Sequence, residues 1–251
     1  MQQKLYTLLE LLLTRLKRRE YHLDRRIPIV TLFSIVVRRV IWLLRGLLKT
    51  TFLQFRPKAI FVAPGVKFRN SGRCRFGNGV TLETGVVLDG LSEFGINLGD
   101  SVTVGAYSLI RSSTAMHLGE GMTIGRNSSC DAFSFFGAGG RITIGENVIM
   151  GQHVSFHAET HNHSDTDVPI RSQGVTRKPI VVEDDCWVGA NVTFLGGAHV
   201  SRGSIVGAGA VVNKQYPAFS VIAGVPATVI RSRLPTPKGI DSLDEIGKQK
   251  T

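Results

Sequence analysis

Apolar side chains recur at every sixth position over much of the C-terminal part of the chain. The clearest run is Val182, Val188, Phe194, Val200, Val206 and Val212. An amphipathic helix would repeat its apolar face about every 3.6 residues, and a half-buried strand would repeat it about every 2. A period of six instead predicts a solenoid, in which each coil contains three short strands joined at corners.

Shorter runs with the same period, shifted in phase, lie upstream. They are Phe76, Leu82, Leu88; Leu98, Val104, Ile110, Met116; Leu118, Ile124, Cys130, Phe136; and Ile144, Met150, Phe156. We expect these residues to point inward and stack on their counterparts in the next coil, because a single coil cannot bury its apolar face alone. The pattern predicts an all-β solenoid domain over residues 58–231.

The longest interruption of the repeat covers residues 157–181, where the sequence carries charges, prolines and serines. We expect a loop to leave the solenoid here, and loops of this length in compact domains are often functional. Residues 232–251 combine prolines with several charges and predict a poorly ordered tail.

Residues 1–57 differ in kind, because their leucines and valines recur at helical spacing among arginines and lysines. We expect two helices, separated near Pro28. Residues 1–58 carry a net charge of +10, whereas the remaining residues carry +1. This combination predicts a basic amphipathic extension on the inner face of a membrane. The alternative is a helical cap on the first coil.

The longest uncharged stretch, residues 27–37, has eleven residues and is too short to span a bilayer.

The distribution of charge and the cysteines further restrict which partners and which cellular compartment we expect. The basic charge is confined to the N-terminal extension, and no nucleic-acid-binding signature is present, so we expect no nucleic-acid partner. Cys74, Cys130 and Cys186 are odd in number and form no CxxC pair. Together with Glu10, which interrupts the first apolar run, they favour a cytoplasmic chain over a secreted one.

Three stretches in this order resemble the hexapeptide-repeat acyltransferases, and especially the bacterial sugar and exopolysaccharide O-acetyltransferases. They are residues 178–192 (KPIVVEDDCWVGANV), 206–214 (VGAGAVVNK) and 223–231 (AGVPATVIR). The resemblance covers about residues 58–233 and implies a left-handed parallel β-helix, an exception to the usual right-handed crossover. It also implies a homotrimer with acetyl-CoA in the clefts between subunits, and no metal. The acetyl group would pass directly to a hydroxyl of a sugar or cell-envelope saccharide, including a lipid-linked one, with a histidine as general base.

Four histidines lie near the start of the loop: His153, His157, His161 and His163. In the family the base falls five residues after the last inward residue before the loop; here that residue is Phe156, which indicates His161. Counting back from Trp187 indicates His163 instead. We favour His161, because the loop between is the part that varies in length. An imidazole with a pKa near 6.5 suits proton removal from a hydroxyl.

Glu159 and Asp165 are both candidates to orient His161. The resemblance further implies that the Ala190 backbone N–H stabilises the oxyanion. The residues expected to contact the coenzyme are Trp187, Gly189, Ala190, Gly207, Ala208, Asn213, Lys214 and Arg231. Cys186 falls at an inward position, and we expect it to be inert packing.

Three alternatives remain open. The acceptor could be an amino sugar, serine or a xenobiotic. The same fold could serve a metal-dependent hydratase that uses histidines from adjacent subunits. A solenoid scaffold without catalysis is the third, although a scaffold needs neither His161 nor the 178–192 motif.

Overall fold

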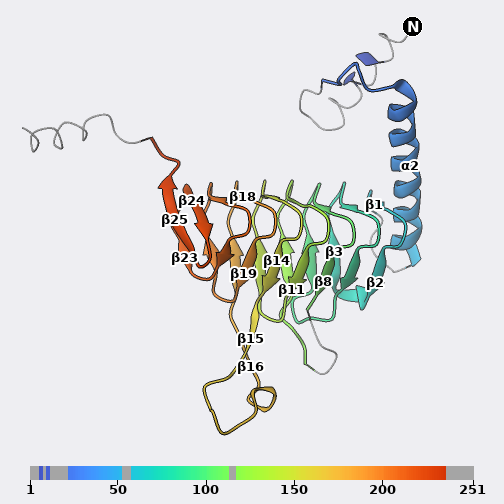
Figure 1. The fold of residues 1–251 in the computed structure, drawn as a ribbon. Coiled ribbons are helices and arrows are strands. Elements are labelled where there is room, and N and C mark those ends of the chain that lie inside the picture. Colours follow the sequence, from blue (N-terminus) through green and yellow to red (C-terminus); the bar gives the residue numbers. More distant parts are fainter. Residues whose placement is uncertain (1–5, 8–9, 12–21, 53–57, 113–116, 236–251) are drawn as a thin grey trace, which may run out of the picture.

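The computed structural model describes residues 6–7, 10–11, 22–52, 58–112 and 117–235. Helix α2 (Ile29–Phe52) stands at one end of a β-solenoid, and a two-stranded ribbon projects from the solenoid's underside (Figure 1). The solenoid is a parallel β-helix of the left-handed class with an N-terminal helix, so the predicted fold class is confirmed.

Three parallel sheets form the sides of the solenoid. Sheet A contains β1 (Phe61–Val62), β4 (Thr81–Leu82), β7 (Thr103–Val104), β10 (Ser129–Cys130), β13 (Ile149–Met150), β18 (Trp187–Val188), β21 (Ile205–Val206), β24 (Ser220–Gly224) and β25 (Ala227–Ser232). Sheet B contains β2 (Lys67–Arg69), β5 (Val87–Asp89), β8 (Leu109–Arg111), β11 (Phe135–Gly137), β14 (Ser155–His157), β19 (Thr193–Leu195) and β22 (Val211–Val212). Sheet C contains β3 (Cys74–Phe76), β6 (Ile96–Leu98), β9 (Met122–Ile124), β12 (Ile142–Ile144), β17 (Ile180–Val182), β20 (His199–Val200) and β23 (Gln215–Tyr216). Only the β24–β25 pair at the C-terminal end is antiparallel within these sheets.

Each coil turns three corners, which we name corner A/B, corner B/C and corner C/A after the sheets they join. In the coil that contains β18, these corners fall at Asn191, Gly197 and Asp185, with φ of 58°, 92° and 57°. Left-handed φ values favour glycine, asparagine and aspartate, which explains why small and polar residues follow the inward apolar positions.

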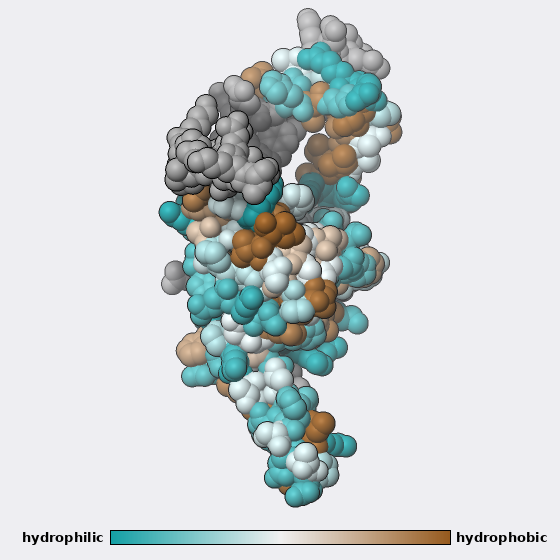
Figure 2. All heavy atoms as spheres, turned by 60° about the vertical axis from the view of Figure 1, so that its left-hand side comes forward, coloured by the Kyte–Doolittle hydropathy of each residue, from teal (hydrophilic) through white to brown (hydrophobic). Residues whose placement is uncertain are grey.

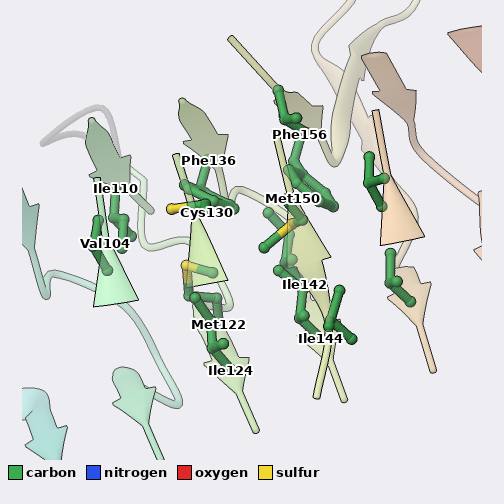
Figure 3. Packing of buried hydrophobic residues seen from close by; sticks show 14 of the residues in the cluster. Val104, Ile110, Met122, Ile124, Cys130, Phe136, Ile142, Ile144, Met150 and Phe156 are labelled. Atoms are coloured by element: carbon green, nitrogen blue, oxygen red, sulfur yellow. The ribbon is translucent and has the colours of Figure 1, made fainter. Parts of the chain in front are cut away.

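The six-residue pattern corresponds to the core. Side chains from successive coils stack inside the solenoid, as Figure 3 shows for Ile110, Phe136 and Phe156. Phe156 stacks on Phe136 and Phe194, with ring centroids 5.0 Å and 4.4 Å apart. The strand pairing places these inward residues directly opposite one another, Phe136 opposite Phe156 and Phe156 opposite Phe194. Repeated from coil to coil, this alignment builds one continuous core.

Two members of the predicted runs need separate mention. Leu118 is 46% exposed, so its assignment to the core was wrong. It lies just after β8, where the coil is interrupted, and its carbonyl accepts a hydrogen bond from Arg177 instead. Met116 lies outside the described residues.

Helix α2 begins directly after Pro28, where the sequence predicts a boundary. Gly46 packs so closely on Ile60 that an added Cβ would lie 1.9 Å from the Ile60 carbonyl oxygen. Arg39 donates to Thr81 Oγ1 at 3.2 Å, and Lys49 donates to the Val66 carbonyl at 3.1 Å. The helix therefore rests on the first coils. Most of the other predicted helix, and the tail after residue 235, lie outside the described residues.

Short 3₁₀ turns occur at Ser71–Arg73 and Ile170–Ser172. A search of the described helices for a segment long and apolar enough to cross a membrane finds none.

Candidate active site

The predicted loop is a β-ribbon that leaves the solenoid at corner B/C. Strands β15 (Glu159–His161) and β16 (Val175–Arg177) pair antiparallel, with Glu159 opposite Arg177 and His161 opposite Val175. Arg177 Nε lies 3.0 Å from Glu159 Oε2, and Arg177 Nη1 donates to the Leu118 carbonyl at 2.7 Å. These contacts fix the base of the ribbon against the coils.

The tip of the loop is held by its own polar side chains. Thr176 Oγ1 donates to Asn162 Oδ1 at 2.6 Å, and Asn162 Nδ2 donates to the Gln173 carbonyl at 3.0 Å. Gln173 Nε2 in turn donates to the Asp165 and Val168 carbonyls, both at 2.7 Å. The two candidate bases therefore lie on an organised segment.

His161 and His163 differ in their partners. His163 Nδ1 lies 3.0 Å from the His161 carbonyl oxygen. Because a carbonyl can only accept, Nδ1 carries the proton, and Nε2 of a neutral His163 is left as a base. The His161 imidazole is exposed and is hydrogen-bonded by no described side chain. Neither predicted orienting carboxylate reaches it, since Glu159 pairs with Arg177 and Asp165 Oδ1 accepts from the Asp167 N–H.

Both histidines line an open groove of about 310 Å³ on one side of the ribbon. Its other walls come from Lys178, at the end of the loop, and Gly196, at corner B/C of the following coil. A Cβ at Gly196 would lie 3.3 Å from the Lys178 Cβ, so the missing side chain helps to keep this groove open.

A second cavity, of about 160 Å³, lies at the base of the ribbon and was not found from the sequence. It is lined by Arg111, Ser112, Phe135, Gly137, Gly139, His157, Glu159 and Arg177. The Phe135 and His157 rings form one wall, with centroids 5.5 Å apart. The Arg111 guanidinium has no hydrogen bond or ion pair within the described part of the chain. An arginine at the end of a strand carries no sequence signal of this kind, because only the coil register brings it beside His157.

Most of the predicted coenzyme residues lie on sheet A or at corner A/B, which follows it. Trp187, on β18, is 56% exposed and pairs with Ile205, which pairs with Val221, which pairs with Arg231. Trp187 and Arg231 therefore share one line across sheet A, three strand spacings or about 14 Å apart. Gly189 stacks directly on the next corner, since an added Cβ would lie 2.6 Å from the Ala208 nitrogen.

Corner A/B also presents unused backbone donors. In two earlier coils a carboxylate accepts from the amide at this corner: Ala106 N donates to Glu83 Oε2 at 3.2 Å, and Ala132 N donates to Asp131 Oδ1 at 2.7 Å. The equivalent amides of Ala190 and Ala208 donate to no group among the described residues. Two adjacent corner N–H groups are thus free to bind an oxygen that carries negative charge.

The remaining predicted residues lie elsewhere. Asn213 and Lys214 follow β22 at corner B/C, one coil beyond Gly196, and Lys214 Nζ lies 5.9 Å from the centre of the Tyr216 ring. Ala190 and Gly196 are separated by one full side of the solenoid, at most about 20 Å for six extended residues. A single chain therefore places the candidate base and the candidate oxyanion donor at different corners.

Cys186 is buried, as predicted, and burial raises the pKa of its thiol to about 11. Cys74 and Cys130 are also buried, with pKa values raised to about 11 by the same cause. Because the thiolate is the reactive form, these cysteines are poor nucleophiles. The described residues contain no group of three or more His, Cys, Asp or Glu side chains that could hold a metal ion.

Comparison with known proteins agrees with this architecture. Residues 179–214 match the family model described as Bacterial transferase hexapeptide (six repeats). A probable acetyltransferase of Mycobacterium tuberculosis is 36% identical over 73 residues, which are 29% of this chain and 24% of that protein. A 2,3,4,5-tetrahydropyridine-2,6-dicarboxylate N-acetyltransferase of Staphylococcus aureus is 49% identical over 53 residues, 21% of this chain and 22% of that protein. The chain thus matches a quarter or less of the length of these curated relatives.

Solved structures show the same kind of likeness. A hexapeptide-repeat acetyltransferase from Vibrio cholerae is 28% identical with a TM-score of 0.49, covering 55% of this chain and 74% of that chain. A maltose O-acetyltransferase from Clostridium difficile is 19% identical with a TM-score of 0.42, covering 69% and 70%. The six-residue repeat and the three-sided coils define the class of fold, a parallel β-solenoid, and residues 179–214 are similar to the bacterial transferase hexapeptide repeat.

Proposed function

We propose that this protein is an acetyl-CoA-dependent O-acetyltransferase that acts on a sugar or a cell-envelope saccharide. The observation that carries the proposal is the pair of free corner amides, Ala190 and Ala208, in the segment that matches the transferase repeat. Turn amides often find a partner, as those of Ala106 and Ala132 do in two earlier coils. The corner amides of Thr84 and Gln152 donate to no group among the described residues either, so the match to the transferase repeat is what singles out Ala190 and Ala208. Free N–H groups at this corner suit the oxygen of a thioester as it becomes an oxyanion.

The reaction needs three parts. The His161 imidazole takes the proton of the acceptor hydroxyl while the hydroxyl oxygen forms a bond to the thioester carbonyl carbon. The Ala190 N–H donates to the resulting oxyanion. The C–S bond then breaks, and the coenzyme thiolate takes the proton from the imidazolium. The general base contributes about 10²–10⁴ to the rate, and one oxyanion donor contributes about 10²–10³.

The site is assembled between subunits of a homotrimer. Corner B/C carries His161, Lys178 and Lys214, whereas corner A/B carries Ala190 and Ala208, and one chain keeps these corners on opposite edges of sheet B. A second copy that presents its corner A/B to the groove would bring base and donor together. Lys214 and Arg231 then supply cations for the coenzyme phosphates.

The acceptor occupies the cavity at the ribbon base. Its walls offer an aromatic surface, Phe135 with His157, and the polar groups of Arg111 and Glu159. Convergent polar groups beside an apolar surface suit a polyhydroxylated ring. An amine acceptor would use the same steps, and the Staphylococcus aureus relative carries the name of an N-acetyltransferase. Assays with hydroxyl and amine acceptors side by side, monitored with labelled acetyl-CoA, distinguish the two.

His161→Ala tests the assignment of the base. We expect turnover to fall by at least about 10², with the Kd for acetyl-CoA changed less than about twofold, because the change removes the base and leaves the coenzyme corner intact. Turnover is measured as coenzyme release, and the Kd by isothermal titration.

His163→Ala is the matched comparison, since it lies in the same groove two residues away. It should retain most of the activity. The assignment is wrong if His163→Ala is the inactive variant and His161→Ala is not, which would move the role to the free Nε2 of His163.

A further inference from the structure

The side of α2 that faces away from the solenoid is apolar along its whole length. Its exposed residues recur at intervals of three and four and so lie on one face. They are Val30, Phe33, Val37, Val40, Leu44 and Leu48. In Figure 2 brown spheres follow the helix where it rises past the solenoid. The opposite face holds Arg39, Gly46 and Lys49, which contact the first coils, and Trp42, which is partly buried against the core of the solenoid.

Helix α2 exposes its apolar face and turns charged side chains toward the protein, whereas an ordinary surface helix does the opposite. A cap on the solenoid would bury its apolar face and expose its charges. Here two of the four charged side chains, Arg39 and Lys49, donate to groups of the solenoid, while the apolar face has no covering among the described residues. A contiguous exposed apolar surface that runs along a whole helix marks a contact with another molecule or with lipid.

The charge of the helix indicates which of these two, another molecule or lipid, covers the apolar face. Residues 29–52 contain four basic side chains and no acidic one. Arg38 and Arg45, two turns apart, lie on one flank of the apolar face and line an open groove of about 600 Å³ between α2 and the coil at Pro64 and Glu83. The Arg45 guanidinium has no hydrogen-bond or ion-pair partner within the described ranges. Arginine is well suited to phosphate, which it binds through two parallel hydrogen bonds.

We propose that α2 binds an anionic lipid surface, with its apolar face in the boundary between headgroups and acyl chains and with Arg38 and Arg45 on lipid phosphates. An interfacial helix of this kind lies in the plane of the membrane, immersed by about 5–10 Å. A second copy of the chain is a poorer occupant, because two such helices would bring like charges together.

This inference does not rest on the acetyltransferase assignment, and its test is independent of activity. If the protein both transfers acetyl groups and binds the membrane, soluble acetyl-CoA meets an acceptor that is attached to a lipid carrier. The solenoid would then stand on the membrane by the end that carries α2.

The test is co-flotation of the full chain with vesicles of phosphatidylcholine containing about one third phosphatidylglycerol, compared with pure phosphatidylcholine. We expect binding to the anionic vesicles that weakens at high salt. Leu44→Gln combined with Leu48→Gln should reduce the partition coefficient at least about tenfold, because each removes a buried leucine from the bilayer contact. Arg38→Gln combined with Arg45→Gln should reduce binding to anionic vesicles and leave the weak binding to phosphatidylcholine unchanged.

Leu234→Gln is the matched control, since Leu234 is 57% exposed and Leu44 is 55% exposed, but Leu234 follows β25 at the other end of the solenoid. Circular dichroism and the mass in solution are measured for each variant. The proposal fails if the unmodified chain does not float with anionic vesicles, or if Leu234→Gln weakens flotation as much as the α2 variant. A loss of oligomer mass in the α2 variant without any change in flotation would instead assign this face to contacts between copies.

Discussion

At the scale of single residues, Arg111 is the most informative side chain outside the predicted site. It ends β8, lines the cavity at the ribbon base and has no partner among the described residues, whereas Arg177 in the same cavity is already paired with Glu159. An unpaired guanidinium beside an aromatic wall is available to a ligand. We infer that it contacts the acceptor and not the coenzyme, for which we propose a site at corner A/B.

Arg111→Ala should therefore raise the KM for the acceptor about 10- to 100-fold, the loss expected when one hydrogen bond to a charged group is removed. The KM for acetyl-CoA should stay within about twofold. Arg111→Lys should recover part of the loss, because it keeps the charge but not the planar fork.

Arg126→Ala provides a control, since Arg126 pairs with Glu146 at the surface and lies outside the cavity. Steady-state kinetics with each substrate varied in turn separate the two KM values. Equal increases in both, or an effect of Arg126→Ala as large as that of Arg111→Ala, would contradict a specific contact with the acceptor.

At the scale of the secondary-structure elements, stability depends on stacking between coils. Phe156 is fully buried on β14, with Phe136 of β11 on one side and Phe194 of β19 on the other. It also occupies the last inward position before the ribbon, so its packing connects the coils on both sides of the loop.

We expect Phe156→Ala to lower the free energy of unfolding by about 3–5 kcal/mol, because it removes a buried ring and leaves a cavity between two others. Urea denaturation monitored by circular dichroism measures this. Phe94→Ala, at a ring that is 56% exposed and lies under Arg141, should lower it by less than about 1 kcal/mol. Similar losses for the two variants would show that stacking inside the solenoid is not what holds these coils together.

At the scale of the whole molecule, the separation of the two corners predicts complementation between inactive chains. His161→Ala removes the base at corner B/C, and Ala190→Pro removes the N–H at corner A/B. If each site combines these corners from different subunits, mixed trimers contain some sites in which both parts are intact. Each trimer that contains both chains has one intact site among three, so the doubly purified trimers should show about a third of the normal activity.

The two chains are co-expressed with different tags and purified through both. Each variant alone should be inactive, and light scattering should report a trimer. Should proline at 190 disturb the turn, Trp187→Ala replaces it, because Trp187 is on β18, the strand that leads into corner A/B. Mixed trimers without activity, or a fully active monomer, would place the whole site within one chain.

The sequence alone determined the solenoid, because its evidence is local: a six-residue period buries the same positions in every coil, and small or polar residues mark the corners. The run from Val182 to Val212 and the ring column at Phe156 follow directly from it. The pattern failed at Leu118, where an interruption of the coil breaks the period that the prediction relies on. The sequence also located the loop and the two candidates for the general base, His161 and His163.

Tertiary structure alone decided which of these residues meet. Pairing between strand residues 10 to 26 positions apart places Arg111 beside His157, Trp187 in line with Arg231, and Lys214 at the corner of the ribbon instead of the corner of Ala190. No spacing along the chain reveals these neighbours, because the coils differ in length. The sequence likewise showed that α2 is amphipathic and basic, but only its packing through Gly46 on Ile60 determined that the apolar face is the one turned outward.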